Sequence, residues 1–337
     1  MYRALYPPVD PPLPGYGCPG AGKEKPTVRY GVPYRGSKNK IAQWVTSNLP
    51  AGETLIDLFA GGCAVTHAAL LSGKWNHIVA NDIGDAPQLF MDAVHGKYAN
   101  EKRWISREDF HRLKDSDPYV SLCWSFGNNR RDYLYSKEIE PWKKALHYAR
   151  VFGDTSLLRE FGINSDGSSK DIKTNSEEYK RFYSQWLGCQ AKHKMLHDLG
   201  HLERIKNLER LQNLERLQNL ERLQNLGAIQ KLEGLQMNYR DAQIPSNAVV
   251  YADPPYKRTN CTGYKCDFDH ELFEKWLAEV PFMVVISEYE APSGCVEVAS
   301  AKKQSTMGAG NKGGSAIEKL FVQERFVEQY KQMMGRF

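Results

Sequence analysis

The sequence predicts a doubly wound α/β sheet, and three observations carry this prediction. A short apolar run at 53–62 contains Asp57 and ends in two glycines, and a helix candidate follows at 64–72. A second apolar run, at 77–82, ends in Asp82. Strand, glycine turn, helix and strand in this order begin a doubly wound sheet. Apolar runs at 248–253 and 281–287, with a helix candidate at 268–280 between them, continue it.

The segments outside these runs differ in composition. Residues 1–26 are rich in proline and glycine, which disfavour regular helices and central strands and predict an irregular arm. Apolar residues at helical spacing predict a helix over 41–49. Residues 101–200 are polar and rich in tryptophan, tyrosine, arginine and lysine, which indicates an insertion or a second domain.

An internal repeat occupies residues 202–235. The motif Leu-Glu-Arg-Leu-Gln-Asn begins at Leu208, Leu214 and Leu220, with a looser copy at Leu202. Leucines at every third position drift around an α-helix, which turns about 100° per residue, so a helix and a six-residue solenoid both remain open. The near-identity of the copies indicates recent duplication and favours a spacer or an additional surface without chemistry.

Composition limits the partners and the location. The chain has 337 residues, a formal net charge of +5 and seven cysteines, none of them in a CxxC pair. The mildly basic charge permits a nucleic-acid partner without requiring one. The cysteine spacing favours reduced structural thiols and no metal site. No apolar stretch reaches the roughly 18 residues of a membrane helix, and no apolar secretory core is present, so we expect no membrane partner and a cytoplasmic location.

Acidic residues stand at the ends of three predicted strands: Asp57, Asp82 and Asp253. Ligands of open α/β sheets bind beyond the carboxyl ends of the strands, so we expect these acids along one edge. The glycine turn lacks both the GxGxxG spacing of a dinucleotide fold and the lysine of a phosphate loop. With Asp82 placed to accept hydrogen bonds from ribose hydroxyls, the pattern predicts a nucleoside ligand without a phosphate chain. A tight turn without a ligand is the alternative.

Asp253-Pro-Pro-Tyr256 predicts a site for a planar base. The two prolines remove two N–H donors and fix the backbone, which leaves carbonyl acceptors beside the Asp253 carboxylate. An exocyclic amine would give its hydrogens to these acceptors while its ring stacks on Tyr256. A strand end with a proline turn and a surface tyrosine is the structural alternative.

These motifs resemble those of the Dam-like, D12 class DNA adenine-N6 methyltransferases and occur in the same order. Pro33-Tyr-Arg-Gly-Ser-Lys38 is similar to the N-terminal cofactor segment, and Asp57-Leu-Phe-Ala-Gly-Gly62 to the main S-adenosylmethionine motif. Asn81-Asp82 resembles the ribose-binding step, and Asn238-Tyr-Arg-Asp241 the segment whose acid contacts the cofactor adenine. Asp253-Pro-Pro-Tyr256 resembles the catalytic tetrapeptide. The likeness covers residues 28–100 and 236–325.

The resemblance implies a Rossmann-like methyltransferase domain at 27–100 and 236–337, with a mostly helical target-recognition insertion at 101–201. It implies S-adenosylmethionine as cofactor, double-stranded DNA as substrate, and methyl transfer to adenine N6 after base flipping. The implied catalytic residues are Asp253, Pro254, Pro255 and Tyr256. The implied cofactor-binding residues are Tyr34, Lys38, Asp57, Phe59, Ala60, Gly61, Asp82 and Asp241.

Several alternatives remain open. The insertion carries Trp124-Ser-Phe-Gly-Asn-Asn-Arg-Arg131 and not the pattern of GATC-reading members, so no recognition sequence is predicted. Asp253 favours adenine N6 over cytosine N4, where serine is typical, and over protein glutamine, where asparagine is typical. No Pro-Cys dipeptide occurs, which disfavours cytosine C5. An RNA substrate and a catalytically inactive DNA-binding scaffold, which the repeat would support, remain, and no oligomeric state is predicted.

Overall fold

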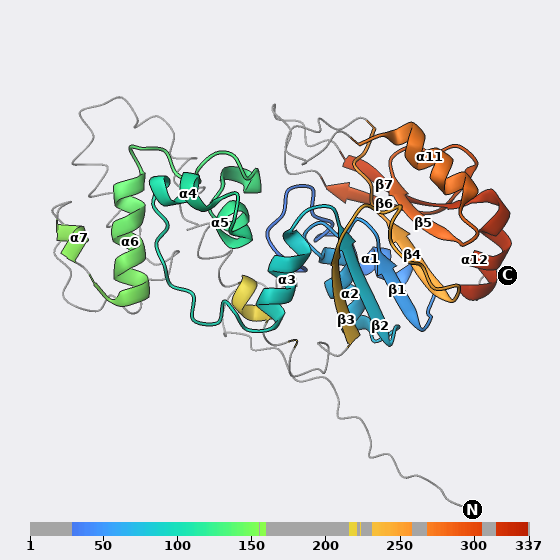
Figure 1. Ribbon diagram of the computed structural model, residues 1–337, viewed down its shortest axis with the longest axis horizontal. Helices are drawn as coiled ribbons and strands as arrows, with labels where there is room; N and C mark the ends of the chain where they lie inside the picture. Colours follow the sequence, from blue (N-terminus) through green and yellow to red (C-terminus); the bar gives the residue numbers. More distant parts are fainter. Residues whose placement is uncertain are drawn as a thin grey trace, which may run out of the picture.

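A seven-stranded, mostly parallel sheet forms the centre of the protein, with strand order β3-β2-β1-β4-β5-β7-β6 (Figure 1). This computed structural model describes residues 29–154, 156–159, 216–220, 223, 231–257, 268–304 and 315–335. The strands are β1 (Thr54–Asp57), β2 (His77–Asp82), β3 (Leu232–Gln236), β4 (Ala248–Ala252), β5 (Val284–Glu288), β6 (Cys295–Gln304) and β7 (Ser315–Gln323). The predicted α/β class is confirmed in its main feature, because such a sheet fits a methyltransferase fold.

The strand order reverses between β1 and β4. The chain runs outward from β1 through β2 to β3, then returns to β4 on the other side of β1, with all of these strands parallel. β5 follows in parallel beside β4, whereas β7 and β6 add an antiparallel edge. Such a reversal opens a crevice at the carboxyl ends of the two central strands, which is where open α/β sheets bind ligands.

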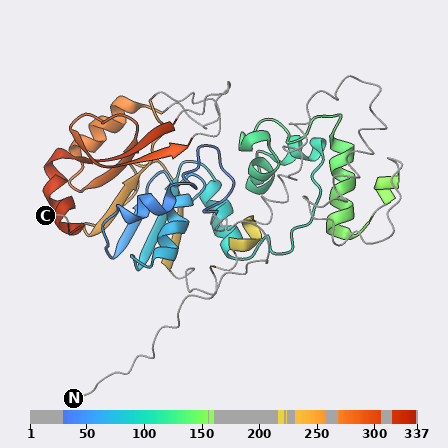
Figure 2. The same cartoon turned by 180° about the vertical axis from the view of Figure 1, so that it is seen from behind.

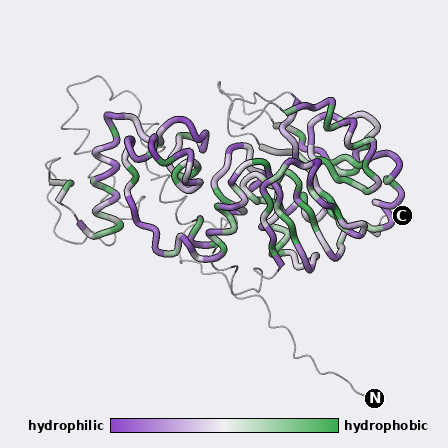
Figure 3. Tube along the Cα trace, in the orientation of Figure 1, coloured by the Kyte–Doolittle hydropathy of each residue, from purple (hydrophilic) through white to green (hydrophobic). Residues whose placement is uncertain are grey.

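Helices cover both faces of the sheet, because successive strand residues point to opposite sides. Leu55 lies in the larger core cluster with α1, α2, α3 and α12, whereas its neighbour Ile56 lies in a second cluster with α11. Figure 3 shows the hydrophobic residues concentrated along the strands and the inner sides of the helices. These helices are α1 (Ala42–Ser47), α2 (Ala64–Ser72), α3 (Ala86–Val94), α11 (His270–Glu279) and α12 (Val327–Met333).

A second group of helices stands to one side of the sheet, beyond α3, as Figures 1 and 2 show from opposite directions. Two of them begin at a side chain that accepts a backbone N–H, Ser106 before α4 and Asp117 before α5, as expected of N-cap residues. The elements are α4 (Arg107–Leu113), α5 (Pro118–Cys123), η1 (Phe126–Asn128), α6 (Glu140–Phe152) and α7 (Ser156–Arg159). The rest of the predicted insertion and the predicted arm lie outside the described residues.

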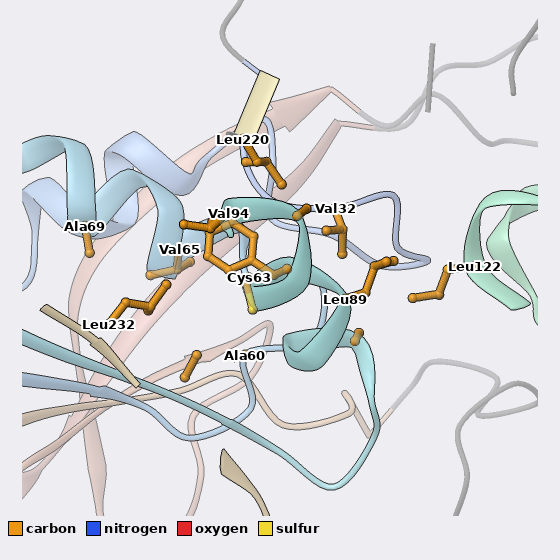
Figure 4. Close-up of a cluster of buried hydrophobic side chains, with 14 of the residues drawn as sticks. Val32, Ala60, Cys63, Val65, Ala69, Leu89, Val94, Leu122, Leu220 and Leu232 are labelled. Carbon is orange, nitrogen blue, oxygen red and sulfur yellow. The ribbon is translucent and has the colours of Figure 1, made fainter. Parts of the chain in front are cut away.

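The described part of the repeat is packed into the core. Residues 216–220 are helical, and Leu217, Leu220 and Leu223 are buried in the larger core cluster. Figure 4 shows Leu220 directed toward the cluster that contains Val32 and Val94. Three leucines at a spacing of three spread over only about 120° of a helix, which is narrow enough for one buried face. For these residues, the interpretation as a spacer or an additional surface is wrong.

Element boundaries differ from the sequence prediction at two places. β3 begins at Leu232, inside the predicted repeat range, because it completes the parallel edge beside β2. β6 and β7 were not predicted, because a long antiparallel hairpin has no strong local signal without its turn. The other predicted elements are confirmed to within a few residues: α1, β1, α2, β2, β4, α11 and β5.

The segment before α1 lies directly on the glycine turn that follows β1. Val32 donates its N–H to the Gly62 carbonyl at 2.8 Å. Gly31 has φ +67, and a Cβ added there would lie 2.0 Å from the same carbonyl oxygen. Arg216, from the repeat, holds this segment from outside, because its Nε donates to the Gly31 carbonyl at 2.6 Å. Close backbone approach at this point therefore requires glycine.

A pair of glycine substitutions tests this contact. Gly73 has φ +66, but a Cβ added there would meet no heavy atom within 4 Å, so it shares the backbone conformation of Gly31 without the crowding. We expect Gly73→Ala to cost about 1 kcal/mol of unfolding free energy through left-handed strain. Gly31→Ala is expected to cost at least about 2 kcal/mol more, because the backbone must shift. Equal losses in urea unfolding would contradict the close contact.

Candidate active site

The carboxyl ends of four neighbouring parallel strands place acids along one edge of the sheet. Asp57 ends β1, Asp82 ends β2, Asp253 follows β4, and Glu288 ends β5. In the parallel register, Asp57 lies beside Tyr251, two residues before Asp253. The predicted convergence of the three aspartates at one edge follows directly from this register.

Asp57 is a buried carboxylate with one unsatisfied oxygen. Its Oδ2 accepts a hydrogen bond from Thr66 Oγ1 at 2.7 Å, whereas Oδ1 has no hydrogen-bond partner among the described residues. Burial, followed by the negative charges of Asp253 and Asp82, raises the pKa of Asp57 to about 7. Burial therefore disfavours the charged form of Asp57 in the ligand-free protein.

The glycine turn and Tyr34 are in close contact. A Cβ on Gly61, which has φ +46, would lie 2.8 Å from the Tyr34 ring, and one on Gly62 would lie 2.5 Å from Tyr34 Cβ. The turn is also tied to the next strand, because Ala60 donates its N–H to the Asn81 carbonyl at 2.8 Å. A backbone without side chains is thus presented at the end of β1.

Asp82 fastens the far side of the same turn. Its Oδ2 accepts from the Gly61 N–H at 2.8 Å, and its Oδ1 accepts from the Gly84 N–H at 2.7 Å. Burial raises the pKa of Asp82, although these two hydrogen bonds act in the opposite direction. Each carboxylate oxygen retains a second lone pair, so Asp82 can hold the turn and still accept from a ligand.

An aromatic cluster connects the turn with the segment after β3. Phe59 lies 5.2 Å from Tyr239 and 5.8 Å from Phe273, measured between ring centroids. Tyr239 is buried, and two residues later Asp241 is exposed at the turn between β3 and β4. The Phe59 side chain therefore packs in the core cluster with α11.

Lys38 lies between two carboxylates at the end of β4. Its Nζ is 2.8 Å from Asp253 Oδ1 and 3.0 Å from Glu318 Oε1. Burial by itself lowers the pKa of Lys38, but the charges of the two carboxylates outweigh it and raise the pKa to about 12. Lys38, which the resemblance places on the cofactor side, thus contacts the tetrapeptide 253–256 directly.

The Tyr256 ring is fixed by its hydroxyl group. Tyr256 is 7% exposed, and its hydroxyl accepts from Lys38 Nζ at 2.5 Å and donates to Glu318 Oε1. Ser287 Oγ lies 3.0 Å from the same hydroxyl, and the Tyr289 ring meets the Tyr256 ring edge-on at 4.6 Å. The Tyr256 side chain is therefore held by several contacts and buried, and it is not the surface side chain of the structural alternative.

The structure brings most of the residues expected from sequence to this edge, and it adds two more. Sequence analysis missed Ser287 and Glu318, which complete the cluster around Lys38 and Tyr256. The sequence did carry one signal for Glu318, since it alternates with Leu320 and Val322, and all three are fully buried. A charged residue in line with core positions of a strand indicates a buried polar contact.

The raised pKa of Asp57 predicts a stability cost that depends on pH. Between the ordinary value of 3.8 and about 7, the folded protein keeps a proton that the unfolded chain has released. The unfolding free energy thus falls as pH rises through this range, and the loss is complete above about pH 7. We expect Asp57→Asn to be more stable than the natural protein at pH 8, by on the order of a few kcal/mol.

Chemical unfolding at pH 5 and pH 8 measures this difference. The advantage of Asp57→Asn should shrink toward pH 5. A difference that does not change with pH, or a variant less stable at pH 8, would show that Asp57 is not a destabilising buried charge.

Comparison with known proteins finds a family resemblance over part of the chain. Residues 34–182 match the family of D12 class N6 adenine-specific DNA methyltransferases, a range that includes Tyr34, Lys38, the glycine turn and Asp82 but ends before Asp253. No curated protein matches the chain. Among the described residues, no group of three or more potential metal ligands occurs, and no helix is long and apolar enough to cross a membrane. Over residues 34–182, which are less than half of its length, the chain is therefore similar to the D12 class N6 adenine-specific DNA methyltransferases, a family of enzymes.

Proposed function

We propose that the protein transfers the methyl group of S-adenosylmethionine to N6 of a flipped adenine in double-stranded DNA. The observation that carries the proposal is the meeting of Asp57, Asp82 and Asp253 at the point where the strand order reverses. The first two suit a nucleoside with an amino-acid tail, and the third suits an amine on a planar base. Ligands that react with one another need such adjacent sites.

The residues around the glycine turn fit S-adenosylmethionine. Asp57 Oδ1, the unsatisfied buried acceptor, suits an ammonium group that reaches it directly or through water. At Gly61 the Tyr34 ring takes the space that a side chain would need, so Tyr34 packs on the turn against which the ligand is proposed to lie. When bound, S-adenosylmethionine supplies an electrophilic methyl group on a positively charged sulfur.

Further contacts to the cofactor are assigned by position. Asp82 accepts from the ribose hydroxyls with its remaining lone pairs, and Asp241 accepts from the adenine amine at the end of β3. Tyr34 encloses the ligand from the side of the segment that precedes α1. Phe59, Ala60 and Gly61 contribute their backbone groups.

The tetrapeptide holds the acceptor amine. The Asp253 carboxylate and the Pro254 carbonyl accept the two N6 hydrogens, which directs the nitrogen lone pair toward the methyl group. In the transfer, the bond from N6 to the methyl carbon would form as the methyl–sulfur bond breaks and leaves a neutral thioether. The positive charge would pass to N6, which would then release one hydrogen as a proton to the Asp253 carboxylate or to solvent. Tyr256 is the stacking surface for the base. Because its ring is 7% exposed, stacking requires the residues above it, including Tyr289, to move aside when DNA binds.

Residues 101–201 are proposed to form the target-recognition region. Their described helices stand beside the sheet next to α3, and Phe126 in the turn after α5 is 64% exposed. Arg130 in the same turn pairs with Asp85, three residues after Asp82, and connects this region with the cofactor side of the site. Base flipping costs a few kcal/mol, which stacking and hydrogen bonds in the site offset.

A methyl-transfer assay tests the function. The protein is incubated with unmodified DNA and methyl-labelled S-adenosylmethionine, and the labelled nucleoside is identified after digestion. We expect N6-methyldeoxyadenosine, and we expect Asp253→Asn to lower the transfer rate by about a hundredfold or more. The cofactor dissociation constant of the variant, which should stay close to the natural value, confirms a folded site. Label on another nucleoside, no label in the DNA, or full activity of Asp253→Asn would overturn the proposal.

Cofactor binding is expected to depend on pH through Asp57. The deprotonated carboxylate binds the ammonium group, so affinity should rise with pH through about 7 and fall by up to about tenfold per pH unit below it. Calorimetric titration with S-adenosylhomocysteine between pH 5.5 and 7.5 measures this. Burial raises the pKa of Glu288 to about 7 as well, so either carboxylate could cause a pH dependence in this range. The Asp57→Asn variant decides which of the two is responsible. That variant should bind weakly and without the pH dependence; a persisting dependence would assign it to another group.

A further inference from the structure

Glu318 is a fully buried carboxylate outside every motif of the sequence. It lies in β7, next to the strand β5 whose end carries Ser287, and its side chain is 0% exposed. A buried carboxylate is costly unless cations and hydrogen-bond donors surround it. The groups that contact the Glu318 carboxylate thus indicate its role.

Three donors converge on one oxygen of this carboxylate. Glu318 Oε1 accepts from the Tyr256 hydroxyl and from Ser287 Oγ at 2.9 Å, and it lies 3.0 Å from Lys38 Nζ. Tyr256 belongs to the proposed catalytic tetrapeptide, and Lys38 is the ion-pair partner of Asp253. Glu318 is therefore connected to both ends of the tetrapeptide: to Tyr256 directly, and to Asp253 through Lys38.

The charges of Lys38, Asp253 and Glu318 affect the amine at which the methyl group is transferred. Lys38 alone with Asp253 would make a neutral pair, and its positive charge would oppose the positive charge that develops on N6 during methyl transfer. With Glu318, one ammonium group is shared by two carboxylates, so these three groups, counted by themselves, carry one negative charge in excess beside the amine. Fixed negative charge at the place where positive charge develops favours the transition state.

We propose that Glu318 is a positioning residue for methyl transfer: it holds the Tyr256 hydroxyl and shares Lys38, so that Lys38 does not fully neutralise the Asp253 carboxylate that faces the amine. The inference rests on the proposed function. It concerns a residue that touches neither the base nor the cofactor and acts through Tyr256 and Lys38.

The first test compares two glutamates of the same hairpin. Glu297 in β6 pairs with Lys319 at 2.8 Å, as Glu318 pairs with Lys38, but its side chain is 40% exposed. We expect Glu318→Gln to lower the single-turnover transfer rate by about tenfold or more while changing the dissociation constant for S-adenosylhomocysteine by less than about threefold. Glu297→Gln should leave both unchanged. A natural transfer rate in Glu318→Gln would overturn the inference.

The second test uses thermal unfolding of the ligand-free protein, which requires no activity. Lys38→Met leaves the Asp253 and Glu318 carboxylates without the cation between them. We expect Glu318→Gln to lower the unfolding temperature of the natural protein but to raise that of Lys38→Met, because it removes one of two repelling charges. A side chain that only fills space would give the same change in both backgrounds, and that result would overturn the inference.

The two tests separate this inference from the proposed function. If the natural protein methylates no adenine, the proposed function fails, and the unfolding cycle still decides whether Glu318 and Lys38 are coupled. If it methylates adenine and Glu318→Gln does so equally fast, only the role of Glu318 is lost.

Discussion

The ammonium group of Lys38 is the interaction on which the proposed catalytic half of the site depends. It joins three parts of the chain that are far apart in sequence: the segment before α1, the end of β4 through Asp253, and the antiparallel edge through Glu318. Burying the Lys38 ammonium group without a paired carboxylate would be strongly unfavourable, and the same holds for burying a carboxylate without the ammonium group. Removing the ammonium group would leave the buried Glu318 carboxylate and the partly buried Asp253 carboxylate without the cation between them, so this ion pair constrains the geometry of the tetrapeptide.

The proposed cofactor half follows a different principle, because among the described residues no cation forms an ion pair with the Asp57 carboxylate at its centre. Asp57 is buried beside the charges of Asp82 and Asp253, and its pKa is raised to about 7 as a result. The folded chain is less stable for this, and a ligand with an ammonium group relieves the cost. The same buried Asp57 carboxylate thus lowers the stability of the fold and would favour binding of an ammonium group, a combination that is common at functional sites.

Sequence patterns were sufficient for the parts of the fold that local chemistry determines. Strands β1 and β2, the glycine turn and the acids at the strand ends were predicted because apolar runs that stop at an acid are local signals. The pairing of Lys38 with Asp253 was not predicted, since it joins residues more than two hundred positions apart through tertiary packing. The burial of Leu217 and Leu220 was missed for a related reason: near-identical repeats do not reveal which copy faces the core.

A crystal structure of the protein with S-adenosylhomocysteine tests the central claim most directly, that the strand-end acids form one binding site at the reversal between β1 and β4. The account predicts electron density for the homocysteine ammonium group at Asp57, for the ribose at Asp82, and for the sulfur directed toward Asp253. Density elsewhere, or a ligand that leaves Asp57 and Asp82 without contact, would contradict it.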